Sequence, residues 1–98
     1  TIIFDEIDSG VSGEIGRKMG RILKQISLNG QVICITHLPQ IAAKGESHYK
    51  VLKTQENQKT ITNMVKLTSE ERIVEIATML EGDKISASAV AHAKQLLN

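Results

Sequence analysis

The hydrophobic pattern begins with a short apolar run, residues 2–4, that stops abruptly at two acids, Asp5 and Glu6. A continuous apolar run of this kind is typical of a strand covered on both faces, as in a parallel sheet. A second such run covers residues 32–35 and stops at residues 36–37, a threonine and a histidine. We therefore expect two buried strands, each ending in polar side chains.

Between these runs the apolar residues recur at helical spacing, which predicts an amphipathic helix of about four turns. Ser12 stands where a helix N-cap is expected, and residues 29–30, Asn-Gly, provide the usual stop. A strand–helix–strand order predicts two parallel strands joined by a right-handed crossover. The stripe that we expect to be buried consists of Ile15, Met19, Ile22, Leu23 and Ile26.

The middle of the chain alternates between apolar and polar residues. This alternation covers residues 47–54 and 60–67, and it predicts half-buried antiparallel strands. The polar residues 55–59 between them have the length of a hairpin connection. His48, at the start of the first strand, is interpreted as an ordinary surface histidine.

Two helices are predicted after the hairpin. Thr68 and Glu71 form a capping-box pattern at the start of the first helix, and Gly82 closes it. Ser86 is placed to cap the last helix. A single helical turn is also expected at residues 41–43, before Gly45. The apolar residues on the two C-terminal helices are Ile73, Ile76, Ala77, Leu80, Ala89, Val90, Ala93, Leu96 and Leu97.

Composition narrows the class of protein only modestly. Ninety-eight residues make one small domain or a piece of a larger one, with one Phe, one Tyr and no Trp for its core. A net charge of +1 favours neither a nucleic-acid binder nor a binder of acidic substrates, although a small basic patch can hide in a balanced total. The basic residues of the first helix, expected to form a solvated face, are Arg17, Lys18, Arg21 and Lys24.

Other features concern the compartment and the extent of the chain. A single cysteine, Cys34, fits a reducing compartment and is expected to be an inert, buried thiol. No stretch has the length of a membrane span, and no signal peptide is visible. The chain opens at Thr1 directly in a predicted central strand, so we expect the C-terminal part of a longer protein.

The candidate chemistry lies where the two predicted strands end. Asp5 and Glu6 follow the first strand and His37 follows the second, at the same edge of a parallel sheet. In open α/β sheets this is the edge that binds ligands. Paired carboxylates suit phosphate chemistry, in which one holds Mg²⁺ and the other orients the attacking water. The alternative is that Asp5 and Glu6 only begin a solvated loop.

These segments together resemble the C-terminal half of an SMC-like, ABC-type ATPase head, found in chromosome-maintenance and DNA-repair proteins. Residues 2–6 are similar to the Walker B strand, 8–13 to the D-loop, and 35–40 to the switch-histidine segment. The resemblance runs from end to end and is nearest to a bacterial DNA-repair family. Ser12 departs from most such heads, which carry an Asp late in the D-loop, so no role is taken over from that Asp.

The resemblance implies specific roles for the residues at this edge. Asp5 would bind the Mg²⁺ of ATP, and Glu6 would activate the attacking water. His37 would sense the γ-phosphate of the nucleotide. The D-loop residues would border the nucleotide and meet the opposite subunit of a head-to-head homodimer; they are Asp8, Ser9 and Gly10.

The resemblance also implies what lies outside this chain. The sequence has no Gly-rich Walker A loop and no heptad run long enough for a coiled coil. Residues 1–98 would then form one partial domain that needs the missing N-terminal half of the head to bind ATP and Mg²⁺. Alone, they would be inactive.

The family setting implies a cytoplasmic, nucleoid-associated bacterial ATPase that acts on DNA in double-strand-break repair and recombination, with no membrane partner. Two alternatives stay open at this point. One is another SMC or ABC-type head with a role in chromosome maintenance. The other is a non-catalytic dimerisation or assembly module that works through its hairpin and terminal helices.

Overall fold

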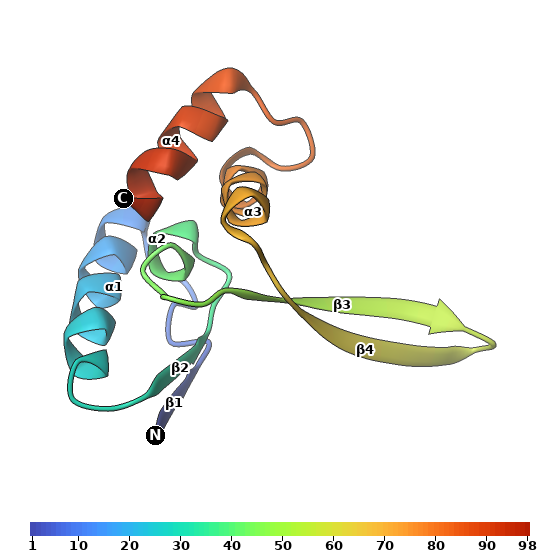
Figure 1. The fold of residues 1–98 in the computed structure, drawn as a ribbon, viewed down its shortest axis with the longest axis horizontal. Helices are drawn as coiled ribbons and strands as arrows, with labels where there is room; N and C mark the ends of the chain where they lie inside the picture. The colour runs from blue at the N-terminus through green and yellow to red at the C-terminus, as the bar shows by residue number, and fades with distance from the viewer.

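The computed structural model describes all residues, 1–98, as two small sheets and four helices (Figure 1). This confirms the α/β class expected from the sequence. The elements in chain order are β1 (Ile2–Asp5), α1 (Gly13–Ser27), β2 (Val32–Ile35), α2 (Pro39–Ala42), β3 (Tyr49–Glu56), β4 (Lys59–Lys66), α3 (Ser69–Glu81) and α4 (Ala87–Leu97).

The two N-terminal strands pair in parallel, as predicted, with Ile3 opposite Ile33 and Asp5 opposite Ile35. Because side chains alternate along a strand, these four residues lie on one face of the pair. Ile3 is 65% exposed and Ile35 51% exposed, whereas Phe4, on the opposite face, is half-buried. Parallel strands are normally covered on both faces. The isoleucine face is therefore open in this chain.

Helix α1 buries only part of the side that its apolar pattern predicts: Leu23 is buried, and Met19 and Ile26 are partly buried. Ile15 and Ile22 are exposed, whereas Gly16 and Gly20 are buried along with Leu23. A Cβ on Gly20 would lie 3.1 Å from the backbone oxygen of Gln40. The absence of side chains at the glycines lets α1 lie directly against α2, and this contact determines which side of the helix is buried.

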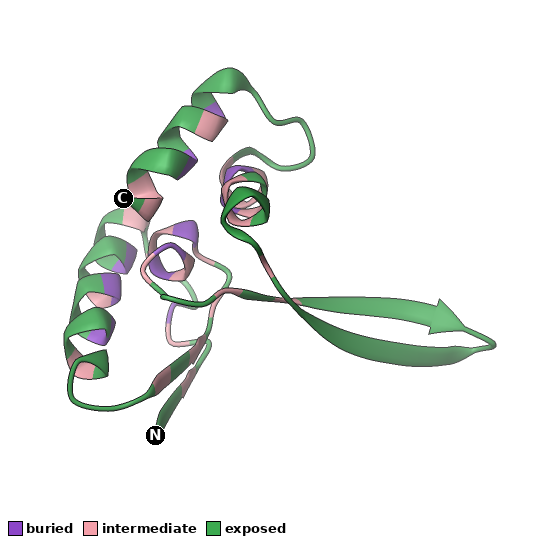
Figure 2. Cartoon of the chain, viewed as in Figure 1, coloured by how far each residue is buried: buried purple, intermediate pink, exposed green.

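The hydrophobic core lies among the short helix α2 and the two C-terminal helices, away from the parallel strands (Figure 2). The capping box predicted for α3 is present: the Thr68 Oγ1 accepts from the Glu71 N–H at 3.2 Å, and the Glu71 carboxylate accepts from the Thr68 N–H at 2.9 Å. Ser86 caps α4, as expected, by accepting from the Ala89 N–H at 3.1 Å. The buried core residues are Ala43, Ile76, Ala77, Ala89 and Ala93.

The hairpin β3–β4 is antiparallel, as predicted, but the expectation that it is half-buried is wrong. It projects from the body of the molecule (Figure 1), and every residue of β4 is exposed. Val51 stands opposite Met64, and both are more than half exposed. At its base, Lys50 pairs with Glu75 of α3 at 2.8 Å. Alternation along a strand shows which residues share a face, but not whether another element covers that face.

Two further expectations concerned single side chains. His48 is half-buried rather than a surface residue, and its Nδ1 has no hydrogen-bond partner. Burial lowers the pKa of His48, and the nearby Arg72 and Lys50 lower it further, although Glu75 opposes them. Cys34 is partly rather than fully buried, and burial raises the pKa of its thiol, as expected for an unreactive cysteine. No helix in the chain has both the length and the apolar character needed to span a membrane.

We expect this chain to self-associate at high concentration. The apolar face of β1–β2 is open, and the projecting hairpin β3–β4 exposes strand edges whose backbone groups can pair with another chain. Replacing Ile3 and Ile33 by lysine is expected to weaken association at least about ten-fold, since it charges that open face. Sedimentation velocity over a concentration series measures the effect. The matched control is Leu28→Lys, an isolated residue that is 78% exposed. A clean monomer at high concentration would contradict the prediction.

Candidate active site

The two predicted acidic residues lie at the carboxyl end of β1. Asp5 is the last residue of the strand, and the N–H of Glu6 still donates to the Ile35 oxygen at 3.0 Å. The backbone then turns sharply, because Glu6 has a φ of +52°. For a residue with a Cβ this left-handed conformation costs about 1 kcal/mol. Both side chains are exposed, and neither forms an ion pair within the chain.

The carboxylate of Asp8 is the central anchor of this edge. Asp8 is completely buried, and its Oδ2 accepts from the Thr36 hydroxyl. The same oxygen accepts from the backbone N–H of His37 at 3.1 Å and of Leu38 at 3.2 Å. One side chain from the loop after β1 therefore binds three consecutive residues after β2. This contact holds the loops after the two strands together.

The hydrogen bonds at Asp8 favour its ionised form. Burial by itself raises the pKa of the Asp8 carboxyl, but the Thr36 hydroxyl and the His37 backbone N–H outweigh this effect, with a smaller contribution from the His37 ring. The net result is a pKa below the ordinary value of 3.8. The second oxygen, Oδ1, is buried without a hydrogen-bond partner. Asp8 is thus a buried anion whose hydrogen bonds are all accepted by one of its two carboxylate oxygens, Oδ2.

His37 combines an anchored ring nitrogen with an accessible side chain. Its Nδ1 lies 3.4 Å from the Asp8 Oδ2, and 66% of the side chain is exposed. This is an electrostatic contact between a carboxylate oxygen and an imidazole nitrogen, with Nδ1 as the ring nitrogen nearer to Asp8. In this arrangement Nε2 is the ring nitrogen available outside the chain.

Sequence reasoning placed Asp8 in the D-loop but did not predict its contact with Thr36. Thr36 was noted only as the polar end of the second strand. Its hydroxyl donates to Asp8 and accepts from the Leu38 N–H at 3.0 Å, which forms a local side-chain turn before Pro39. Threonine hydroxyls commonly accept from the backbone N–H two residues on, so the sequence could signal this turn but not the contact with Asp8.

The other two predicted loop residues lie beside this anchor and are exposed. The N–H of Ser9 donates to the Glu6 oxygen at 3.4 Å, and Gly10 has a φ of +74°. A Cβ on Gly10 would meet nothing within 4 Å, so a glycine is favoured there by backbone conformation rather than by crowding. Ser9 and Gly10 therefore face outward, whereas Asp8 faces the chain's own β2–α2 loop.

The residues present fit a magnesium ion only as part of a shared site. No group of three or more His, Cys, Asp or Glu side chains is placed to bind a metal ion within the chain. Asp5 offers an exposed carboxylate at the strand end. Mg²⁺ commonly uses one or two carboxylates with water and phosphate oxygens as its other ligands. Asp5 fits this pattern as a single protein ligand.

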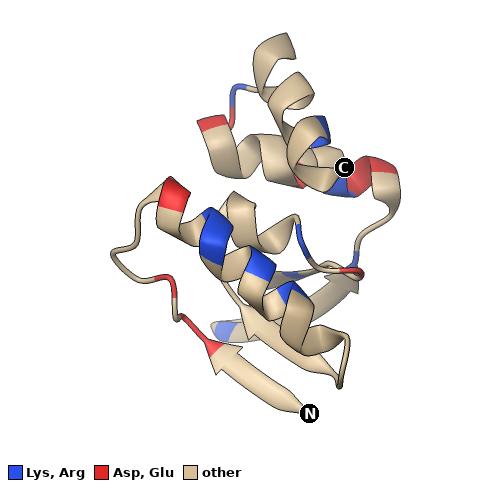
Figure 3. Cartoon of the chain, turned by 90° about the vertical axis from the view of Figure 1, so that its left-hand side faces the viewer, with Lys and Arg blue, Asp and Glu red and all other residues tan.

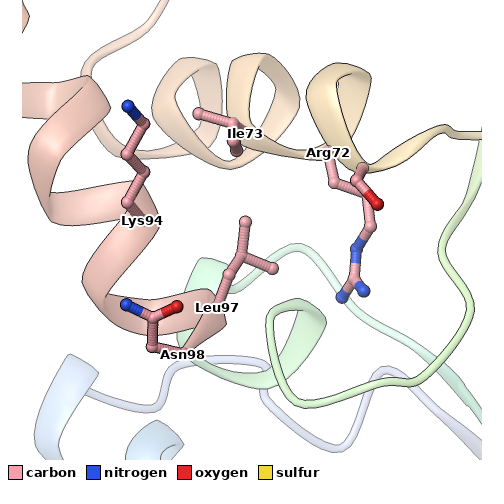
Figure 4. A pocket seen from close by; sticks show the side chains of 6 residues that line it. Arg72, Ile73, Lys94, Leu97 and Asn98 are labelled. Atoms are coloured by element: carbon pink, nitrogen blue, oxygen red, sulfur yellow. The ribbon is translucent and has the colours of Figure 1, made fainter.

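Two cavities elsewhere in the molecule are not lined by any of the predicted catalytic residues. One, of about 240 Å³, lies between α3 and α4 and is lined by Arg72, Ile73, Lys94 and Leu97 (Figure 4). One nitrogen of the Arg72 guanidinium, Nη2, donates to the backbone oxygens of Ala42, Ala43 and Gly45 at 2.8–3.4 Å, whereas the buried Nε has no partner. This cavity is therefore next to a structural contact that fixes the end of α2.

The fold has a counterpart among solved structures. A structure described as "Structural biochemistry of ATP-driven dimerization and DNA stimulated activation of SMC ATPases" superposes with a TM-score of 0.66 and 18% identity. The match covers 84% of this chain and 48% of the other. At this identity the likeness shows the fold alone: the chain has the α/β fold of the matching part of that SMC ATPase structure, which is the fold class expected from its sequence.

Curated relatives share sequence with this chain along its whole length. The chain is similar from end to end to DNA repair protein RecN: 43% identical to that of Vibrio cholerae, 46% to that of Rickettsia typhi and 38% to that of Bacillus subtilis. The chain is thus similar to one segment of these RecN proteins. The alignments cover 99–100% of this chain but only 17–18% of the relatives, so the chain spans less than a fifth of their length. No family model matches the chain.

We predict that Asp8→Asn destabilises the protein by about 1–3 kcal/mol, because it weakens three hydrogen bonds to a buried acceptor. Urea unfolding followed by circular dichroism measures this difference. Asp83→Asn is the matched control, since Asp83 is exposed, and it should change stability by less than about 0.5 kcal/mol. Equal stability of Asp8→Asn and the wild type would contradict the role of the anchor.

The same pair of proteins gives a pH test. Since the pKa of Asp8 is lowered in the folded state, its ionised form contributes stability above the ordinary value of 3.8. That contribution is lost as the pH falls below 3.8 through the native pKa. The stability difference between wild type and Asp8→Asn should therefore be constant near neutrality and shrink in acid. A difference that grows in acid would contradict this sign.

Proposed function

We propose that this chain forms the Walker B, D-loop and switch-histidine part of an ATP-hydrolysing head in a DNA repair and recombination protein. The observation that carries the proposal is the Asp8 anchor, which ties the loop after Glu6 to the segment that bears His37. Similarity to RecN and an SMC-type fold support this function over another type of head or a non-catalytic assembly module.

Each residue at the edge has a proposed role. Asp5 supplies a carboxylate to Mg²⁺, which neutralises charge on the phosphates when it is bound. Glu6 accepts a proton from the attacking water and orients it. His37 directs its free ring nitrogen to the terminal phosphate, while Asp8 fixes the orientation of the ring. Ser9 and Gly10, which face outward, border the nucleotide and the opposite head.

The remainder of the head supplies what this chain lacks. We propose that residues 1–98 form the C-terminal half of the head, and that the Walker A half and the coiled coil lie elsewhere in the same protein. The open isoleucine face of β1–β2 provides an apolar surface on which the other half can pack. Because the phosphate-binding loop belongs to that half, residues 1–98 alone neither bind Mg-ATP tightly nor hydrolyse it.

The proposed partners follow from the same relationships. The complete protein forms a head-to-head homodimer that holds ATP between two heads, and it acts on DNA. RecN is named as a DNA repair protein, and the structural relative is described as a DNA-stimulated, dimerising SMC ATPase. These properties support a cytoplasmic, nucleoid-associated place of action.

In the complete protein, Glu6→Gln should retain ATP binding and slow turnover at least about 100-fold, because it removes the base without changing the shape of the side chain. His37→Ala should also lose turnover, since no imidazole remains to contact the terminal phosphate. Steady-state phosphate release gives the rate, and binding of a fluorescent ATP analogue gives the affinity.

The matched control for this experiment is Glu56→Gln, which makes the same chemical change at an exposed position at the end of β3. Its turnover should equal that of the wild type. Full turnover in either the Glu6 or the His37 variant would show that the assigned role is wrong.

A further inference from the structure

A cavity of about 270 Å³ opens where α1, α2 and α4 meet, away from the candidate active site. Arg17 and Arg21 line it from α1; they are four residues apart and therefore share one face of the helix. Lys44, just after α2, also lines it. The rest of its wall is Gln40, His92, Gln95 and Leu96. Two arginines and one lysine thus line a single cavity, and no carboxylate is among its lining residues.

The position of Lys44 is set by packing. A Cβ on Gly20 would lie 3.0 Å from the Lys44 Cγ, so the aliphatic part of Lys44 lies against α1. The backbone oxygen of Lys44 also accepts from Lys24 Nζ at 3.5 Å. These contacts place the Lys44 side chain beside the helix that carries both arginines.

These cations have no counter-ion within the chain. The two ion pairs present are His37–Asp8 and Lys50–Glu75, and neither involves the cavity. Figure 3 shows basic positions following one another along α1, whereas on that helix acidic colour appears only at its start. Clustered, uncompensated positive charge attracts an anionic partner.

The chemistry of the wall indicates a phosphate ligand rather than a packed protein surface. Leu96 is the only apolar side chain in the lining, in contrast with the isoleucine face of β1–β2. The lining contains no Phe, Tyr or Trp, and the imidazole of His92 is its single aromatic ring. Arginine matches phosphate oxygens in a bidentate manner, and lysine adds a point charge.

We propose that this cavity binds the phosphodiester backbone of duplex DNA, independently of sequence. The proposal deepens the proposed function, on which it rests for the identity of the partner. Arg17 and Arg21 contact phosphate oxygens, Lys44 adds a further charge, and Gln95 offers an amide donor. DNA would then contact the head through α1, whose preceding loop carries Asp8 and the exposed D-loop residues.

The test uses the full-length protein with the double substitution Arg17→Ala and Arg21→Ala. Affinity for duplex DNA should fall about ten-fold at moderate salt, and the slope of log K against log salt should shrink by about 1 to 2. The loss should be equal for unrelated DNA sequences. Fluorescence anisotropy with labelled duplexes of different sequence over a salt series measures the affinity, its salt slope and its dependence on sequence.

Two comparison variants isolate the cavity. Arg17→Lys with Arg21→Lys keeps the charge and should retain most of the salt slope. Lys53→Ala with Lys59→Ala removes the same charge from the exposed hairpin and should leave DNA affinity unchanged. An equal loss in the hairpin variant would overturn the proposal, because binding would then depend on total charge alone.

Other outcomes also decide the question. Unchanged affinity and slope in the double alanine variant would overturn the proposal. So would weaker ATP binding in the absence of DNA, which would assign the cavity to nucleotide, or a lower melting temperature with an unchanged slope, which would assign it to internal packing. Failure of the wild-type protein to hydrolyse ATP or bind DNA would instead refute the proposed function.

Discussion

The candidate site depends on a single buried carboxylate. Asp8 lies in the loop after β1, yet its Oδ2 is bound entirely by groups that follow β2: a hydroxyl, two backbone N–H groups and an imidazole. A buried anion is tolerated only where such donors compensate it. Because these donors come from consecutive residues, the carboxylate fixes the position of that whole segment. The distance between the two strand ends is therefore set by the hydrogen bonds of Asp8 as well as by the backbone hydrogen bonds between β1 and β2.

The surroundings support this anchor from the other side. Arg72 of α3 binds three backbone oxygens at the end of α2, and the glycines of α1 let that helix lie against α2. The short segment that carries His37 is thus held at its start by Asp8 and at its end by the helical core. In contrast, Asp5 and Glu6 are exposed and lie at the open rim. The structure keeps the supporting groups rigid and the reactive groups accessible.

Local sequence signals predicted the elements well, but not what covers them. The capping pattern at Thr68 and Glu71 and the apolar runs of β1 and β2 are local, and all appear as expected. The burial expected for Ile15 and for the hairpin is wrong, because it depends on contacts between elements. In α1, two glycines determined the packing side more strongly than the larger isoleucines did.

In the candidate site, too, some features could be predicted from the sequence and others depend on contacts between distant residues. That Glu6 and His37 share one edge follows from parallel pairing and could be predicted. The Asp8–Thr36 contact joins residues 28 positions apart, and no local pattern announces it. The basic cavity also depends on tertiary structure, because α1, α2 and α4 contribute its lining residues. The net charge of +1 for the whole chain does not reveal this local cluster of positive charge.

The most direct test of this account is a double-mutant cycle between Asp8→Asn and Thr36→Val, measured as both unfolding free energy and ATP turnover in the complete protein. If the carboxylate holds the two strand ends together through Thr36, the second substitution should cost little once the first is made. We expect a coupling energy of about 1–2 kcal/mol in stability and a matching non-additivity in turnover. Simple additivity of the two substitutions in both measurements would contradict the account.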